Sequence, residues 1–253
     1  MDVKELVRKV GHELKKDYYC LESCSTKEKF HLVTKSDETI ERMLINELSE
    51  HFPEYSIYSE EAGNINKVSN KRWIIDPIDG TAYFVLGVPY FAISLCLEEN
   101  SEIVEAYVYN PISDELYFSS KELAKSYLNE RIIKVSETNK INDSLIAVGY
   151  STHFEKIQRY FDEWSALLEN CKKAMPLIAP ALTICNVARG RIDAFIDFGS
   201  SMEGQAAASF ILKHAGGESY NYDFTNYEYS QKGIIATNGK IDMYHIRSMK
   251  KHV

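Results

Sequence analysis

Two carboxylates that could bind a cation stand three residues apart after a strand-like apolar run, in residues 73–81 (WIIDPIDGT). Pro77 fixes its own φ and disfavours helical geometry for Asp76, which predicts a rigid turn where a strand becomes a helix. Magnesium ions prefer oxygen ligands, and Asp76, the Ile78 carbonyl and Asp79 can offer three of them from one short segment. These residue types therefore indicate a site for a divalent cation.

The Gly-Thr pair after the second carboxylate extends this prediction to phosphate. If Gly80 and Thr81 open a helix, their amides face an anion placed at the helix start. A simpler interpretation of the same segment is an Asx-rich turn that only caps a helix, and single matches of this kind are common. The segment alone leaves both interpretations open.

The elements upstream must position further acids around this segment. Residues 55–58 (YSIY) have the composition of a strand and end in the acidic turn Ser59-Glu60-Glu61. Before them, residues 33–37 (VTKSD) open a segment in which apolar residues recur at helical spacing. Those apolar residues are Ile40, Met43, Leu44 and Leu48. A helix start and an acidic turn therefore precede the D-P-I-D-G-T segment.

With these motifs the chain resembles the inositol monophosphatase family of metal-dependent, lithium-sensitive phosphomonoesterases. The similarity runs through V-T-x-x-D (33–37), S-E-E (59–61), D-P-I-D-G-T (76–81), N-P (110–111), A-R-G-R-I-D (188–193) and A-G-G (215–217). The resemblance implies a layered αβαβα sandwich, dependence on Mg²⁺ with Mn²⁺ as a substitute, and a homodimer. It leaves the substrate open among small phosphorylated metabolites, such as a sugar, cyclitol or nucleotide monophosphate.

The resemblance also implies a metal-binding role for individual residues. Glu60 and Asp76, with the Ile78 carbonyl beside them, correspond to ligands of one metal. Asp76 and Asp79 correspond to ligands of a second. Two such metals, roughly 3.5 to 4 Å apart, can stabilise both the attacking and the leaving oxygen of an in-line displacement by water.

Catalytic roles follow from the same resemblance. It implies that Thr81 and Asp37 form a hydrogen-bonded pair that orients and deprotonates the attacking water, with Glu60 assisting. Because metal charge already lowers the pKa of water, a modest base is sufficient. For Asp37 the alternative is an N-cap on the following helix, a role that Ser36 could equally take.

One position departs from the family pattern. Counting back without gaps from the A-G-G motif places Gly204 where the family carries an Asp that ligates the second metal. Glu203 could swing into the vacated place, a water could fill it, or Glu203 could simply be an exposed acid. The missing ligand also leaves a second function open, in which the chain is a catalytically impaired relative acting as a metal- and phosphate-binding or regulatory module.

Other departures lie on the substrate side. Tyr83 stands where an Asn is usual, and either closes part of the site or is a half-buried structural tyrosine. Pro180 removes an amide donor from a loop that holds substrate hydroxyls in relatives. These changes argue against ordinary inositol phosphate recognition. The residues predicted to contact substrate are Gly80, Thr81, Asp197 (where relatives carry a Glu) and Glu203.

Composition narrows the class of protein. With 253 residues, 45% hydrophobic and 26% charged, the chain is an ordinary globular protein. A net charge of −8, from 29 basic and 37 acidic residues, does not suggest a nucleic-acid-binding surface. No run approaches the roughly 18 apolar residues of a membrane span, and the charged start does not resemble a signal peptide. The five cysteines lack zinc-type spacing, which predicts reduced thiols in the cytoplasm, and Cys20 and Cys24 could share a helix face.

The order of predicted elements indicates two subdomains, 1–140 of α+β type and 141–253 of α/β type, with the cation site at their junction. The first contains helices 2–24 and 37–51 and an antiparallel sheet of strands 72–76, 92–98, 103–109 and 116–119. The second alternates strands 145–149 and 194–197 with helices 153–170, 179–189 and 203–214. Arg189 and Arg191, at the end of one such helix, are either solvated or within reach of phosphate.

Overall fold

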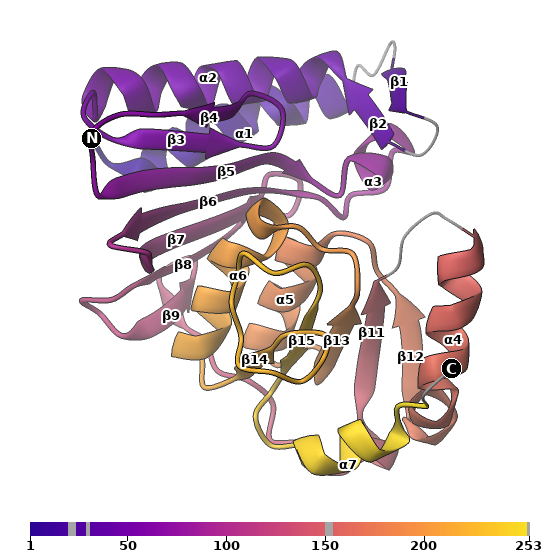
Figure 1. Cartoon of the computed structure of the whole chain (residues 1–253). Helices are drawn as coiled ribbons and strands as arrows, with labels where there is room; N and C mark the ends of the chain where they lie inside the picture. Colours follow the sequence, from indigo (N-terminus) through magenta and orange to yellow (C-terminus); the bar gives the residue numbers. More distant parts are fainter. Residues whose placement is uncertain (20–23, 29–30, 150–153, 252–253) are drawn as a thin grey trace.

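The computed structural model describes residues 1–19, 24–28, 31–149 and 154–251, and they form five layers (Figure 1). Helices α1 (Val3–Tyr19) and α2 (Lys35–His51) cover the outer face of a first sheet. Helices α5 (Pro180–Ala188) and α6 (Met202–His214) form the middle layer between the two sheets. Helices α4 (Phe154–Asn170) and α7 (Met243–Met249) cover the outer face of the second sheet. The predicted αβαβα sandwich is thereby confirmed.

The first sheet has the strand order β10-β9-β8-β7-β6-β5-β3-β4. Its pairs are antiparallel as predicted, except that β3 and β5 run parallel. The exception arises because β3 forms a hairpin with β4 at the sheet edge, and β5 then pairs with the other side of β3. The strands are β3 (Ser56–Ser59), β4 (Gly63–Ile65), β5 (Lys71–Asp79), β6 (Ala92–Glu99), β7 (Glu102–Asn110), β8 (Glu115–Ser120), β9 (Lys125–Leu128) and β10 (Arg131–Ile132).

The second sheet has the order β12-β11-β13-β15-β14. Its strands are β11 (Leu145–Gly149), β12 (Lys173–Pro176), β13 (Ala194–Asp197), β14 (Glu218–Tyr220) and β15 (Ile234–Thr237). The first three are mutually parallel, so their carboxyl ends meet at one edge. The chain crosses from the first sheet to the second between β10 and β11, through the short helix η1 (Ile141–Asp143).

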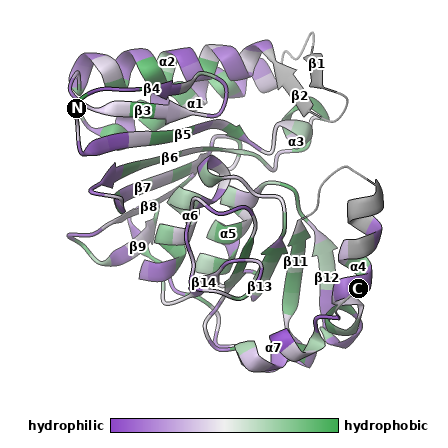
Figure 2. Cartoon of the chain, in the orientation of Figure 1, coloured by the Kyte–Doolittle hydropathy of each residue, from purple (hydrophilic) through white to green (hydrophobic). Residues whose placement is uncertain are grey.

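Three apolar clusters hold the layers together, and β5 shows how one strand serves two of them. Trp73 and Ile75 pack with α1 and α2, whereas Ile74 faces α5 and α6, as the two-residue period of a strand requires. The third cluster joins α4 and α7 to the second sheet. Figure 2 shows the corresponding pattern: α2 carries both hydrophilic and hydrophobic residues, whereas β11 and β13 are hydrophobic.

Helix α6 lies between the sheets because its sequence is small and apolar on more than one side. Ala206, Ala207 and Ala208 are all buried. Small side chains let a helix approach strands closely, and a helix that is apolar all round belongs in a core. The first turn of α6 is thereby placed over the ends of β5 and β6.

Two predictions about local structure are wrong. The first helix ends at Tyr19 instead of residue 24, and Cys24 begins strand β1 (Cys24–Glu28), which pairs with β2 (His31–Thr34). Cys24 therefore cannot share a helix face with Cys20, which lies outside the described residues. Cys96, Cys171 and Cys185 are free thiols. No helix in the described ranges is long and apolar enough to cross a membrane.

Candidate functional site

A bulge at the end of β5 places both acids of the D-P-I-D segment on the inner face of the first sheet. Asp76 lies opposite Ser94 and Asp79 opposite Ala92, so three steps along β5 match two along β6. In a regular strand, residues three apart point to opposite faces, and the extra residue of a bulge cancels that alternation. The prediction that both acids lie in a turn is therefore wrong. Both acids lie in strand β5, the turn is at Gly80, and helix α3 (Thr81–Val85) follows it.

Asp79 connects the first sheet to the middle layer. Its Oδ1 accepts a hydrogen bond from the Ala181 amide at 3.1 Å, and its Oδ2 accepts one from the Leu182 amide at 2.9 Å. Pro180 precedes these donors at the first helical position of α5, where its missing N–H costs no hydrogen bond. Burial raises the pKa of Asp79 to about 7, although the two amides oppose this rise.

Asp76 is the centre of the acidic cluster. Its side chain is 5% exposed, and its buried Oδ1 has no hydrogen-bond partner among the described residues. Burial raises its pKa well above the usual value, and the charges of four other acids raise it further. Those acids are Glu60, Asp79, Glu203 and Asp37. Asp76 therefore lies within electrostatic range of the three other predicted acids and of Glu203.

Glu41, which the sequence interpretation missed, holds the acidic turn that carries Glu60. Its buried carboxylate accepts hydrogen bonds from the Ser59 hydroxyl and from the amides of Glu61 at 3.1 Å and Ala62 at 2.9 Å. A signal for it was present, because Glu41 interrupts the apolar stripe of α2 one helical turn after Asp37.

Asp37 and Thr81 approach each other as predicted. The Thr81 Oγ1 lies 3.3 Å from Asp37 Oδ2 and 2.9 Å from the Ile78 carbonyl oxygen, so its hydrogen points mainly at the carbonyl. Helix α2 begins at Lys35, which places Asp37 inside the first turn. The alternative interpretation of Ser36 or Asp37 as the N-cap is therefore wrong.

Gly80 has little space around it. Its φ of +86° lies in the left-handed region, and a Cβ here would be 2.8 Å from the Ala179 Cβ and 3.0 Å from the Tyr90 carbonyl oxygen. Only glycine adopts this conformation without strain and also fits this gap. Helix α3 has only five residues, so an anion at its start would depend on the individual amides of Gly80 and Thr81 more than on a helix dipole.

The first turn of α6 faces Asp76. Glu203 is 7% exposed, so the interpretation of this residue as an exposed acid is wrong. A Cβ added at Gly204 would lie 3.8 Å from Asp76 Oδ2, 3.8 Å from the Pro180 Cβ and 3.7 Å from the Ser201 hydroxyl oxygen. Position 204 therefore accommodates a Cβ beside Asp76 in ordinary van der Waals contact.

Asp197 ends β13 close to this cluster. Its Oδ1 accepts a hydrogen bond from the Gly199 amide at 2.7 Å, and burial raises its pKa to about 6. A Cβ at Gly149, its partner on β11, would lie 2.5 Å from Asp197 Oδ2. The carboxylate thus shapes the loop that leads into α6, and its charge contributes to the raised pKa of Asp79.

Helix α5 is fixed at its middle by Tyr90. The Tyr90 hydroxyl lies 3.0 Å from Thr183 Oγ1 and accepts a hydrogen bond from the Asn186 amide nitrogen at 3.2 Å. Tyr83 packs edge-on against the Tyr90 ring, with centroids 5.6 Å apart, and is half-buried. The packing of Tyr83 therefore agrees with its interpretation as a half-buried structural tyrosine.

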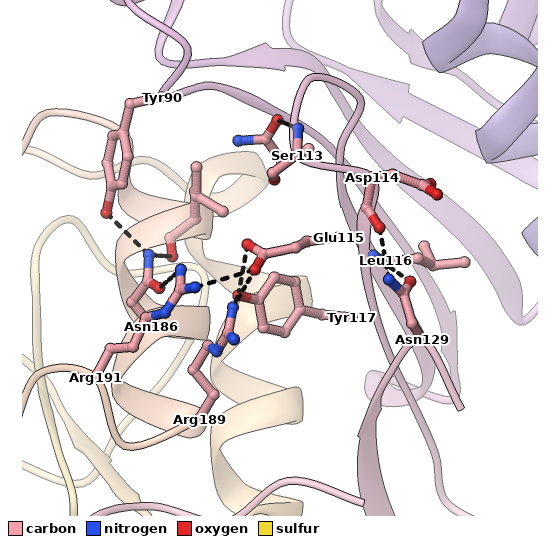
Figure 3. Close-up of polar contacts among 12 residues, drawn as sticks. Tyr90, Ser113, Asp114, Glu115, Leu116, Tyr117, Asn129, Asn186, Arg189 and Arg191 are labelled. Atoms are coloured by element: carbon pink, nitrogen blue, oxygen red, sulfur yellow. Dashed lines mark hydrogen bonds and ion pairs between the residues drawn. The ribbon is translucent and has the colours of Figure 1, made fainter. Parts of the chain in front are cut away.

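The end of α5 is fixed by Glu115 at the start of β8 (Figure 3). The Glu115 carboxylate accepts hydrogen bonds from Arg189 and, at 3.2 Å, from Arg191. Arg189 also donates to the Tyr117 hydroxyl at 3.0 Å. The interpretation of these arginines as simply solvated is therefore wrong, because both bind an acid of the first sheet. Helix α5 is thus held by carboxylates at both ends, Asp79 and Glu115.

The chemistry of the donor set fits a hard cation, although the ligands are not assembled around one point. In the part of the chain that the structure describes, no three His, Cys, Asp or Glu side chains are arranged to hold one metal ion. Within the same part, no lysine, arginine or histidine forms an ion pair with Asp76, Asp79 or Glu203. Buried carboxylates without a cationic partner are costly, and a bound cation removes that cost.

Comparison with known proteins decides the family. The model of the inositol monophosphatase family matches residues 2–253. The chain belongs to the inositol monophosphatase family. It is 29% identical to Inositol monophosphatase 3 of Solanum lycopersicum, with 98% of this chain and 94% of the relative covered. It is 31% identical to Nus factor SuhB of Haemophilus influenzae, with 92% and 89% covered.

Solved structures of the inositol monophosphatase family share the fold. The extragenic suppressor protein suhB from Bartonella henselae superposes with a TM-score of 0.93 at 30% identity, covering 99% of this chain and 98% of that one. Thermotoga maritima IMPase superposes with a TM-score of 0.87 at 28% identity, covering 97% and 93%. Inositol monophosphatases are metal-dependent phosphoric monoester hydrolases, and this chain is a phosphatase of that family.

Proposed function

We propose that this inositol monophosphatase relative is a Mg²⁺-dependent phosphatase that hydrolyses a small phosphorylated metabolite by water attack assisted by two metals. The observation that carries the proposal is the buried Asp76, whose Oδ1 has no hydrogen-bond partner among the described residues and whose pKa is raised by burial and by the charges of four other acids. Phosphate esters are anions, so this cluster needs a cation before it can accept one.

In this proposal Glu60, Asp76 and the Ile78 carbonyl would hold one Mg²⁺, and Asp76 and Asp79 would hold a second, with Mn²⁺ as a substitute. The ions would polarise the phosphoryl group, lower the pKa of a water and neutralise the leaving oxygen. Each oxygen of Asp79 already accepts one amide hydrogen, and its remaining lone pairs are those available to a cation.

The chain itself supplies the proton acceptor. Thr81 Oγ1 can accept a hydrogen bond from the attacking water while its own hydrogen is directed at Asp37 Oδ2, 3.3 Å away. This requires the hydroxyl to turn from the Ile78 carbonyl, which it now contacts at 2.9 Å. A cation that takes the carbonyl oxygen as a ligand would favour that turn. Asp37 then receives the proton, with Glu60 assisting.

The substrate side consists of the Gly80 and Thr81 amides for phosphate, with Asp197 and Glu203 facing the rest of the molecule. Asp197 reaches this region with its Oδ1 bound to the Gly199 amide, so its capacity for substrate hydroxyls is reduced. Pro180 adds no amide donor at the adjacent helix start. Both features support a sugar, cyclitol or nucleotide monophosphate other than the usual inositol phosphate.

The test is steady-state hydrolysis of a panel of phosphate esters with Mg²⁺, for the parent protein and Asp76→Asn. The panel contains inositol, sugar and nucleotide monophosphates. We expect Asp76→Asn to lose activity towards every ester that the parent hydrolyses, because this carboxylate is shared by both proposed cations. Asp143→Asn, an acid of η1 outside the cluster, is the control. Equal rates for Asp76→Asn and the parent would refute the site.

A second function is favoured by one observation, the absence of a side chain at Gly204 beside Asp76. In that case the chain is a catalytically impaired relative that binds metal and phosphate, or acts in regulation. Gly204→Asp discriminates between the two functions, since a Cβ at this position makes only ordinary van der Waals contacts. Activity that exists only in the variant would support the impaired relative, and activity in the parent would exclude it.

The compartment, oligomeric state and partners of the protein stay predictions. We propose a cytoplasmic homodimer whose partner is the small phosphorylated metabolite, without a nucleic-acid or membrane partner. Sedimentation equilibrium of the purified chain tests the dimer, and a mass equal to one chain at micromolar concentration would contradict it.

A further inference from the structure

Glu203 is a buried acid whose position is set by the sheet beneath it. Its carbonyl oxygen lies 3.4 Å from the Ser94 hydroxyl, and Ser94 is the residue of β6 that pairs directly with Asp76. The first turn of α6 is therefore held over the same point of the first sheet from which the Asp76 side chain rises. Because Glu203 is 7% exposed, its carboxylate remains in this junction instead of reaching solvent.

The charge of Glu203 acts on the site residues. Burial raises the pKa of both Asp76 and Tyr58, and the charges of Glu203 and Glu60 raise each further. Within the described residues, Glu203 forms no ion pair with a lysine, arginine or histidine. A buried carboxylate that faces other carboxylates is unfavourable unless a cation lies between them.

Gly204 leaves open the space that such a cation requires. A Cβ at this position would lie 3.8 Å from Asp76 Oδ2, 3.8 Å from the Pro180 Cβ and 3.7 Å from the Ser201 hydroxyl oxygen, so the absent side chain leaves space beside Asp76. Asp76 also presents a buried Oδ1 for which the described residues provide no hydrogen bond. An acid, a gap and an unpaired carboxylate oxygen thus adjoin one another.

We propose that Glu203 is a cation ligand of this site, supplying from the preceding helix position the carboxylate that Gly204 lacks. Its side chain has one more methylene than Asp, and this added reach compensates for starting one residue earlier on α6. Glu203 and Gly204 therefore act as a pair, in which the carboxylate comes from the preceding residue and the glycine leaves space for it beside Asp76. The inference rests on the proposed function, and it changes Glu203 from a substrate contact into a ligand.

The experiment is titration calorimetry with Mg²⁺ and with Mn²⁺, complemented by electron paramagnetic resonance of bound Mn²⁺, which needs no substrate. Four proteins are compared with the parent: Glu203→Gln, the double variant Glu203→Gln with Gly204→Asp, Asp76→Asn, and the exposed-acid control Glu228→Gln. Circular dichroism and thermal melting in EDTA establish that each variant is folded.

We expect Glu203→Gln to weaken one class of cation site by roughly tenfold or more, or to abolish it, because it removes a charged ligand. The double variant should recover most of that loss, since position 204 directs a new carboxylate at Asp76. Glu228→Gln should bind as the parent does. Recovery by the second substitution separates a ligand from a merely structural acid, whose loss an Asp at position 204 would not repair.

Two results would refute either the role of Glu203 as a ligand or the cation site itself, and they can be distinguished. If Glu203→Gln binds the same number of cations with the same affinity as the parent, the role of Glu203 as a ligand is refuted, while loss of binding in Asp76→Asn would still support the proposed function. If the parent binds neither Mg²⁺ nor Mn²⁺, the cation site itself is refuted.

Discussion

Asp79 and Leu182 are joined by a 2.9 Å hydrogen bond between the carboxylate at the end of β5 and an amide in the first turn of α5. With the second bond, to Ala181, the acid caps a helix of another layer. A proposed metal ligand is therefore also one of the residues that attach the middle helix layer to the first sheet. Substitutions at Asp79 consequently change both cation binding and stability, and the two effects can be separated.

The first prediction compares two substitutions of Asp79 in EDTA. Asp79→Ala leaves two buried amides without acceptors and should lower the free energy of unfolding by about 1–3 kcal/mol. Asp79→Asn retains one acceptor oxygen and removes a buried charge whose pKa is raised to about 7, so its stability should stay closer to that of the parent. Urea denaturation measures both. If Asp79→Asn were the less stable of the two, the capping role would be contradicted.

The second prediction concerns pH. Burial raises the pKa of Asp79 to about 7 and that of Asp197 to about 6, both from 3.8. The folded state therefore binds these protons more tightly than the unfolded state, so the stability they contribute at low pH is lost as the pH rises from about 4 through about 7. In EDTA the melting temperature should fall between pH 5 and pH 8, and the fall should be smaller in Asp197→Asn.

Added Mg²⁺ should have the opposite dependence. A cation competes with the protons on these carboxyl groups, so the increase in melting temperature that it causes should be larger at pH 8 than at pH 5. A metal-free protein whose stability is constant or rises over this range would contradict the raised pKa values.

The third prediction uses two glycines with the same backbone region and different surroundings. Gly80 and Gly63 have φ of +86° and +68°. A Cβ added at Gly80 would contact Ala179 and Tyr90, whereas a Cβ added at Gly63 would have no atom within 4 Å. Gly63→Ala should therefore show only the conformational strain, about 1–2 kcal/mol. Gly80→Ala should lose more and should also raise KM for a hydrolysed ester. Equal losses in chemical denaturation would show that the contacts around Gly80 yield without strain.

The fourth prediction concerns Glu41, which holds the turn of Glu60. Glu41→Gln retains an oxygen that can accept from the Glu61 and Ala62 amides, whereas Glu41→Leu leaves these donors unpaired. We expect Glu41→Leu to lose about 1–3 kcal/mol of stability and to bind Mg²⁺ more weakly, and Glu41→Gln to keep most of both. Calorimetry and urea denaturation measure the two effects. Unchanged Mg²⁺ affinity in a folded Glu41→Leu would show that the turn does not position the site.

The sequence by itself determined the elements and the acids at their ends. The strands 145–149 and 194–197 have the predicted bounds, and the helix predicted at 203–214 begins one residue earlier, at Met202. Periodicity and propensity act over short stretches of chain, so they can be interpreted locally. The D-P-I-D-G-T segment likewise indicated a cation site next to a phosphate-binding turn, because the chemistry of its residue types is local.

Only the tertiary structure decided which groups meet these acids. The amides that bind Asp79 come from about a hundred residues later in the chain, and Glu203 is buried because α6 lies between two sheets. The bulge that turns Asp76 and Asp79 to one face depends on pairing with β6. Such contacts arise when distant elements pack, and a local pattern carries no information about which backbone amides or carboxylates that packing will place side by side.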